Sequence, residues 1–152
     1  MAMMRKNAFI PDREAWLVDF WTDVQLASNK SGKTFNFGTL IADSWHQVGI
    51  ERHGVTVNLV VAPTESRIQV ELCIRPGQNA LAIFDSIHSQ KQQIERAIGA
   101  PLVWDRRTQQ KSSFIRLLKT IDARGTDRQV AIDWYVSTLA KFVMVFQQHL
   151  LK

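Results

Sequence analysis

The sequence predicts an α+β fold, with the element order αβββαββα, in which helices pack on one face of an antiparallel sheet. Three observations lead to this class. Apolar and polar residues alternate between tight-turn signals from residue 45 to residue 75, which indicates a three-stranded antiparallel meander. Apolar residues recur at helical spacing before the meander and again after it. A chain of 152 residues has the size of one folded unit, so we expect a single domain over residues 1–152.

The first helix is expected to open at Pro11-Asp12, because an aspartate side chain is a good helix N-cap. The polar segment 29–33 is expected to end it as a turn. Segment 34–43 fits either a short helix or an ordered connector. The apolar face of this helix is formed by Trp16, Phe20, Trp21 and Val24.

The first hairpin of the meander is expected to turn at His53-Gly54, because a glycine accepts a positive φ without strain. Pairing Arg52 with Val55 then sets the register. The resulting pairs are Ile50 with Val57, Val48 with Leu59, and His46 with Val61. A slip by one residue would turn every apolar side chain to the wrong face, so the pattern specifies which face is buried.

The second hairpin is expected to turn at Thr64-Glu65. It pairs Val61 with Ile68, Leu59 with Val70, and Val57 with Leu72. The opposite face of the meander is then polar. On that face Asn58 is expected to lie between Gly49 and Glu71 in one cross-strand row.

After the meander, Asn79 is expected to cap a helix that runs to about Ile98 and ends at Gly99. The inward positions of this helix are Phe84, Ile87, Ile94 and Ile98. Strands near 102–106 and 112–121 are expected to form a second hairpin across a polar, basic turn.

The last helix is expected to run from about Asp127 to Leu150. Its main apolar stripe is Ile132, Val136, Leu139, Val143, Phe146 and Leu150. A second strip, formed by Tyr135, Phe142 and Val145, exceeds what one sheet face usually needs. This surplus is expected to pack either against the first helix or against a second subunit, which would make the protein a homodimer.

Positive charge is concentrated in the last third of the chain. The net charge is +5, and residues 1–100 hold ten Lys/Arg and ten Asp/Glu, so the excess lies in residues 101–152. A local basic excess attracts phosphate backbones or acidic proteins, unless it is simply a solvated surface. The candidate nucleic-acid-binding residues are Arg106, Arg107, Lys111, Arg116, Lys119, Arg124 and Arg128. Arg116 and Lys119 fall on opposite faces of one strand, so these residues cannot all share a patch.

The polar face of the meander invites comparison with restriction-type nucleases, which share the order helix, meander, helix, strand. Those enzymes hold Mg²⁺ with an acidic residue on the second strand and a Glu-x-Lys motif on the third. The corresponding positions are Asn58 and Glu71-Leu-Cys73, where the amide is a weak neutral ligand and the thiol carries no positive charge. Asn58 and Glu71 therefore form either a degenerate catalytic site or a structural pair, and we expect no metal and no cofactor.

Composition also indicates the compartment. The lone Cys73 cannot form an internal disulfide, which fits a reducing cytosol. No stretch approaches the roughly 20 apolar residues that span a bilayer. The N-terminal segment lacks the apolar core of a signal peptide. We therefore expect a cytoplasmic protein that does not enter a membrane.

Several segments resemble one known family in order and spacing. They are Trp16-Leu-Val-Asp-Phe-Trp21, Ser44-Trp45-His-Gln-Val-Gly-Ile50, Arg67-Ile-Gln-Val-Glu-Leu-Cys-Ile74, the helix from Ala82-Ile-Phe-Asp85 to Lys91 and Glu95, and Pro101-Leu-Val-Trp104. Through them nearly the whole chain resembles a bacterial family known only as domain of unknown function 4268. The resemblance implies an α+β domain that is often found downstream of a predicted nuclease domain. It implies no established activity and no catalytic residues.

Three functions follow as expectations. The first is a non-catalytic accessory or nucleic-acid-binding module that assists a nuclease partner in nuclease or defence systems. The second is a protein-interaction or homodimerisation domain. The third is a degenerate, restriction-nuclease-like fold with metal-dependent activity at Glu71. The balance favours a protein that is not an enzyme.

Overall fold

The computed structural model describes the backbone of residues 2–32, 35, 37–38, 40, 42–52, 54–62 and 65–150, and the side chains of these residues apart from 2–12 and 49–52. Its elements are α1 Ala2–Lys30, β1 Trp45–Arg52, β2 Val55–Ala62, β3 Arg67–Ile74, α2 Ala80–His88, α3 Lys91–Ile98, β4 Val103–Asp105, β5 Ser113–Thr120 and α4 Arg128–Leu150.

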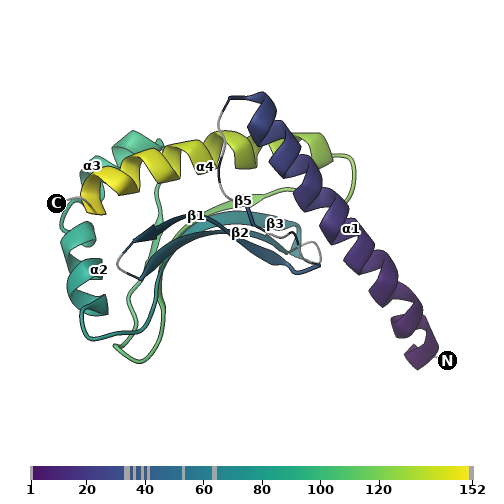
Figure 1. The fold of residues 1–152 in the computed structure, drawn as a ribbon, viewed down its shortest axis with the longest axis horizontal. Helices are drawn as coiled ribbons and strands as arrows, with labels where there is room; N and C mark the ends of the chain where they lie inside the picture. The colour runs from purple at the N-terminus through teal and green to yellow at the C-terminus, as the bar shows by residue number, and fades with distance from the viewer. Residues whose placement is uncertain are drawn as a thin grey trace.

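The strands form a five-stranded antiparallel sheet in the order β1-β2-β3-β5-β4. The sheet arches, and α4 runs along its convex side while α1 crosses near one end and α2 and α3 lie near the other (Figure 1). In the described part of the chain no helix covers the concave face (Figure 1). The predicted α+β class is confirmed, and the elements follow the predicted order except that two helices, α2 and α3, replace the single helix predicted between β3 and β4.

The register of the second hairpin is confirmed. Val61 pairs with Ile68, Leu59 with Val70 and Val57 with Leu72. All six side chains are fully buried beneath the helices. The alternating pattern predicts this register well because only one alignment of two such strands buries every apolar residue on the same face.

The predicted register of the first hairpin is wrong at its outer end. Arg52 pairs with Val55 as expected, but Val48 pairs with Val57 instead of Leu59, and His46 pairs with Leu59. Between Val48 and Arg52 the chain takes four steps on β1 against two on β2, so β1 contains a bulge of two extra residues. Successive side chains point to opposite faces, so an even number of extra residues leaves the same side chains on the buried face. The residue beside Asn58 is consequently Gln47 and not Gly49. Gly54 has φ +75°, as predicted for this turn, whereas His53, Pro63 and Thr64 lie outside the described residues.

The first helix differs from its predicted start. It begins at Ala2, so Pro11 and Asp12 lie within α1 and Asp12 is not an N-cap. The residues before Pro11 include Ala, Met, Arg and Lys, which favour helix and continue it across the proline.

The helix predicted from Asn79 to Ile98 is two helices. α2 ends at His88 and α3 begins at Lys91. The Ser89 hydroxyl donates a hydrogen bond of 2.6 Å to the carbonyl oxygen of Ser86, a local bond of the kind that competes with helix continuation. Gly99 ends α3 in the left-handed conformation with φ +89°, as predicted for a C-cap. All four predicted inward residues of this segment are buried.

The surplus apolar strip of α4 is buried within the chain. Tyr135 meets Phe20 and Trp21 of α1 edge to face, with ring centroids 5.9 Å and 5.6 Å apart. Phe142 and Val145 are also buried. Of the two alternatives left by the sequence, packing against the first helix accounts for Tyr135, and the whole strip is buried within the chain.

Candidate binding face of the sheet

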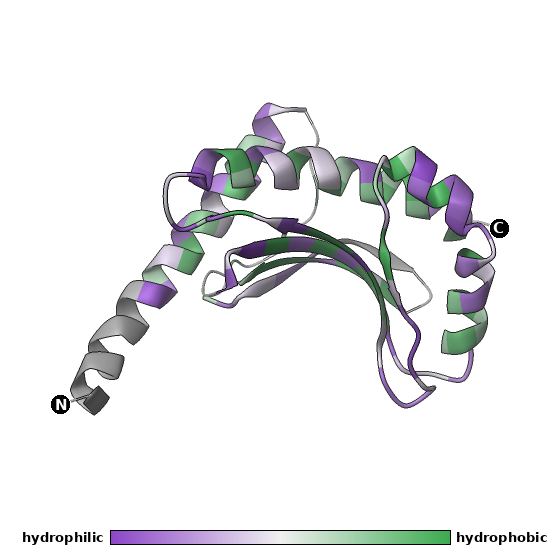
Figure 2. Ribbon diagram, turned by 180° about the vertical axis from the view of Figure 1, so that it is seen from behind, coloured by the Kyte–Doolittle hydropathy of each residue, from purple (hydrophilic) through white to green (hydrophobic). Residues whose placement is uncertain are grey.

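The concave face of the sheet carries side chains from all five strands in two central cross-strand rows. One row is apolar except for Gln69 and is called the apolar row. It contains Trp45, Val60, Gln69 and Leu118, from β1, β2, β3 and β5. The polar row contains Gln47, Asn58, Glu71, Arg116 and Val103, in the same strand order with β4 last. Seen from behind, the strands carry both hydrophobic and hydrophilic residues, and α4 runs along the convex side of the arch (Figure 2).

Glu71 is the centre of the polar row. Its Oε2 accepts a hydrogen bond of 3.1 Å from Asn58 Nδ2. Its Oε1 accepts bonds of 2.8 Å from Gln69 Nε2 and 3.3 Å from Arg116 Nε. Glu71 is only 6% exposed. Three donors therefore compensate the cost of burying its charge.

Arg116 links Glu71 to a second carboxylate. Its Nη1 donates a hydrogen bond of 2.9 Å to Asp105 Oδ2, and the guanidinium lies 4.2 Å from the ring centroid of Phe114. Arg107 donates to the same Asp105 oxygen from Nε and Nη2. Hydrogen bonds from Arg107 and then Arg116 lower the pKa of Asp105 below its usual value. The result is a charge-balanced network across β3, β5 and β4.

The structure brings Asn58 and Glu71 together, as the pairing of their strands predicts. The geometry assigns the carboxylate oxygens to three protein donors, and no cluster of three metal-ligating side chains occurs among the described residues. Cys73 follows on the same face, where burial raises the pKa of its thiol, so it is protonated at neutral pH. These groups fit a structural network and provide neither an open ligand set nor an activated nucleophile.

Among the described residues, two buried polar atoms on the concave face have no hydrogen-bond partner in the protein. They are Asn58 Oδ1 in the polar row and Arg67 Nε on the far side of the apolar row. Buried polar groups are nearly always paired with protein or water, and an unpaired one costs on the order of 1–3 kcal/mol. This face thus has unmet hydrogen-bonding capacity on both sides of the apolar row.

The seven basic candidates do not converge. Arg106, Arg107 and Lys111 lie at the β4–β5 turn, whereas Arg124 and Arg128 follow β5 at its opposite end. β5 has eight residues, so these groups are on the order of 25 Å apart. Arg116 belongs to the polar row, and Lys119 pairs with Ile68 on the opposite face.

Most of these cations also have a partner. Arg106 forms two hydrogen bonds with Asp85, of 2.9 Å and 3.0 Å. Arg128 Nη2 lies 2.7 Å from Asp23 Oδ2. Arg124 lies over the ring of Trp16, with 5.8 Å to its centroid. Trp104 is a packing residue, since it contacts Phe84 and His88 and donates to Glu95. Arg106 and Arg128 are therefore paired with carboxylates at separate places in the fold.

Three apolar residues of the concave face are exposed. Trp45 is 44% exposed, Leu118 43% and Val103 46%. Sequence reasoning did not single them out, because an apolar residue in a strand is expected in the core. The spacing along the strand could have identified Leu118. It lies two residues from Arg116, so the side chains of both residues point to the same face, opposite the core.

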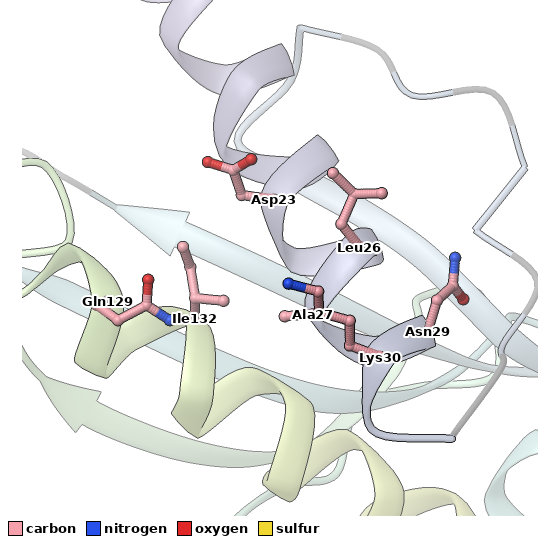
Figure 3. A pocket seen from close by; sticks show the side chains of 7 residues that line it. All are labelled: Asp23, Leu26, Ala27, Asn29, Lys30, Gln129 and Ile132. Atoms are coloured by element: carbon pink, nitrogen blue, oxygen red, sulfur yellow. The ribbon is translucent and has the colours of Figure 1, made fainter.

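A second surface feature is a shallow groove between α1 and α4, with a volume of about 670 Å³ (Figure 3). Leu26 and Ile132 form its apolar part, and Asp23 and Lys30 carry its charge. The lining contains no histidine or cysteine, so it holds no nucleophile or soft metal ligand.

Comparison with known proteins places the chain in a family. Residues 18–150 match the family described as Domain of unknown function (DUF4268). The chain belongs to this family. No curated protein matches the DUF4268 chain significantly. A solved structure described as "Crystal Structure of the ExsC-ExsE Complex" is similar over 84% of this chain and 86% of that one, with 12% identity and a TM-score of 0.43.

Among the described residues, α4 alone is long and apolar enough to cross a membrane by length and composition. Half of its most apolar window is buried inside the protein. That burial is what the core helix of a soluble protein shows.

Proposed function

We propose that this DUF4268 domain is a non-catalytic protein-interaction module that binds an extended segment of a partner protein at the concave side of its sheet. The observation that carries the proposal is the uncovered face with its exposed apolar residues Trp45, Leu118 and Val103. Apolar side chains gathered on one face of a protein are a common mark of interaction sites.

The chemistry around this apolar row supports a polypeptide ligand. The unpaired atoms Asn58 Oδ1 and Arg67 Nε are one acceptor and one donor, and a peptide offers both kinds of group. Glu71 and Asp105 are already neutralised by Arg116 and Arg107, so the face presents little net charge to a phosphate backbone. A cytoplasmic partner in a nuclease or defence system fits this proposal.

The test uses tagged full-length protein in its host, with co-purified proteins identified by mass spectrometry. Leu118→Asp places a charge in the apolar row, and Met144→Asp is the matched control because Met144 is 57% exposed on α4. We expect one or more partners to be lost with Leu118→Asp and kept with Met144→Asp. Retention of every partner by Leu118→Asp would contradict the proposal.

Nucleic-acid binding is the second candidate function, and the β4–β5 turn favours it. Arg106, Arg107 and Lys111 are all exposed there within six residues of chain. Phosphate contacts are strongest at low salt, so the test is binding to labelled single- and double-stranded DNA and RNA at about 50 mM salt. Binding that Lys111→Glu and Arg106→Glu together abolish would support this function, and no binding would eliminate it.

A further inference from the structure

The outer edge of β1 is the most informative feature beside the concave face. In an antiparallel ladder, bonded pairs alternate with pairs whose N–H and C=O groups point away from each other. Val61 N–H donates to the Ser44 carbonyl oxygen over 2.8 Å, so Ser44 and Val61 are a bonded pair. Trp45 comes next along β1 and therefore belongs to a non-bonded pair, and so does Gln47. The backbone N–H and C=O of both residues point away from β2.

Within the described part of the chain, these outward groups lie at a free edge of the sheet. β1 is the terminal strand, and no turn, loop or cap hydrogen bond of the described residues involves the backbone of Trp45 or Gln47. The side chains of the same two residues point to the concave face and are exposed. One short stretch therefore combines unused backbone donors and acceptors with the end of the apolar row.

We infer that a partner's segment binds as an added β-strand along Trp45–Val48, which deepens and rests on the function proposed above. Its backbone pairs with the outward N–H and C=O groups of Trp45 and Gln47. Its residue opposite Trp45 has its side chain on the concave face and extends the apolar row beyond Trp45. The bulge after Val48 ends the regular edge, so about four residues of the partner form this ladder.

The occupant is a peptide segment of another protein, because a ladder of about four residues is far shorter than the roughly 20–30 residues a side that a stable dimer needs. Two copies that pair through Trp45 and Gln47 must place His46 opposite His46, because Trp45 of each copy then faces Gln47 of the other. His46 is buried against Trp21 and Phe37 on the helix side of β1. A second copy would place its own β1 about 4.8 Å away and its own covering residues on that same side of the sheet. An extended segment brings no such covering residues.

The test begins with selection of short random peptides, displayed on phage, against the wild-type protein. A selected peptide is then synthesised with a fluorescent label, and its affinity is measured by anisotropy. Gln47→Pro removes the outward N–H while leaving the ladder to β2, since an edge strand accepts a proline whose nitrogen faces outward. Gln47→Ala is the matched control because it keeps that N–H.

We expect selected peptides with apolar residues at alternate positions, an affinity that Gln47→Pro lowers by about tenfold or more, and a change of less than about twofold with Gln47→Ala. Hydrogen exchange of the wild-type protein gives an independent readout that needs no variant. The amides of Trp45 and Gln47 should exchange fast in the free protein and slowly with peptide bound. This readout decides the matter should Gln47→Pro fail to fold.

Three results would overturn the inference. One is a peptide that binds Gln47→Pro as tightly as wild type and leaves the amides of Trp45 and Gln47 unprotected. If Leu118→Asp abolishes the binding of that peptide, the proposed function stands and only the strand addition fails. Another is the enrichment of no peptide at all, and the partner test with Leu118→Asp then judges the function separately. The third is a wild-type dimer that Gln47→Pro dissociates, which would assign the edge to a second copy.

Discussion

Tyr135 shows at the scale of one residue how α4 is fixed to the sheet. Its ring lies among the aromatic rings of α1, and its hydroxyl donates a hydrogen bond to the carbonyl oxygen of Val60. Tyr135→Phe keeps the ring and removes this bond. We expect the free energy of unfolding to fall by about 1 kcal/mol, measured by urea denaturation. An unchanged value would mean that the hydroxyl adds nothing to the packing of the ring.

His46 makes the stability depend on pH. Burial lowers the pKa of its imidazole, which outweighs the opposing effect of the hydrogen bond that Nε2–H donates to the carbonyl oxygen of Phe37. The unfolded chain therefore binds a proton more readily than the folded one, and stability falls as pH drops below about 6.5, by at most about 1.4 kcal/mol per pH unit for one proton.

The measurement is denaturation by urea at pH 7.5 and 5.5. His46→Phe should flatten the difference between the two values, because it removes the titrating group and keeps an aromatic ring beside Phe37. Carboxylates such as Asp105 have lowered pKa values and act at lower pH, outside this window. A pH dependence that is the same in wild type and variant would assign the effect to another group.

At the scale of elements, Glu95 joins α3 to β4. Its Oε2 accepts hydrogen bonds of 2.7 Å from Leu102 N–H and 3.2 Å from Trp104 Nε1. Glu95→Ala removes both bonds, and we expect a loss of about 1–2 kcal/mol in the free energy of unfolding. Gln92→Ala is the control, since Gln92 is exposed on the same helix. Equal effects of the two substitutions would show that Glu95 does not hold the strand.

The elements themselves were predictable where one pattern determines them. The β2–β3 register follows from alternation, because each apolar residue has a single buried position. The bulge in β1 escapes the same reasoning, since two extra residues keep the alternation intact. The break between α2 and α3 escapes it as well, because the apolar residues Phe84, Ile87, Ile94 and Ile98 keep a helical spacing across it.

The candidate site was predictable only in part. Strand pairing is enough to place Asn58 beside Glu71. One partner of Arg116, Glu71, is 45 residues away in sequence, and the exposure of Trp45 depends on which face the helices cover. Such facts depend on the assembly of the sheet and the helices, so a single sequence does not contain a local signal for them.

At the scale of the whole molecule, the burial of the second α4 strip predicts the state of association. Tyr135, Phe142 and Val145 are covered by the chain itself, which removes the main reason for a dimer through this helix. We expect sedimentation to give the monomer mass of 17.4 kDa across the concentrations tested. A dimer that Met144→Asp or another substitution on the outer face of α4 disrupts would contradict this prediction.

The bulge in β1 also bears on solubility. Exposed sheet edges are templates for aggregation, because strands of other molecules can extend the ladder without limit. Here one edge strand, β4, has three residues, and the other is regular only over Trp45–Val48. Neither edge offers enough length for fibre growth, so the protein keeps a usable docking edge without the hazard that a long flat strand would bring.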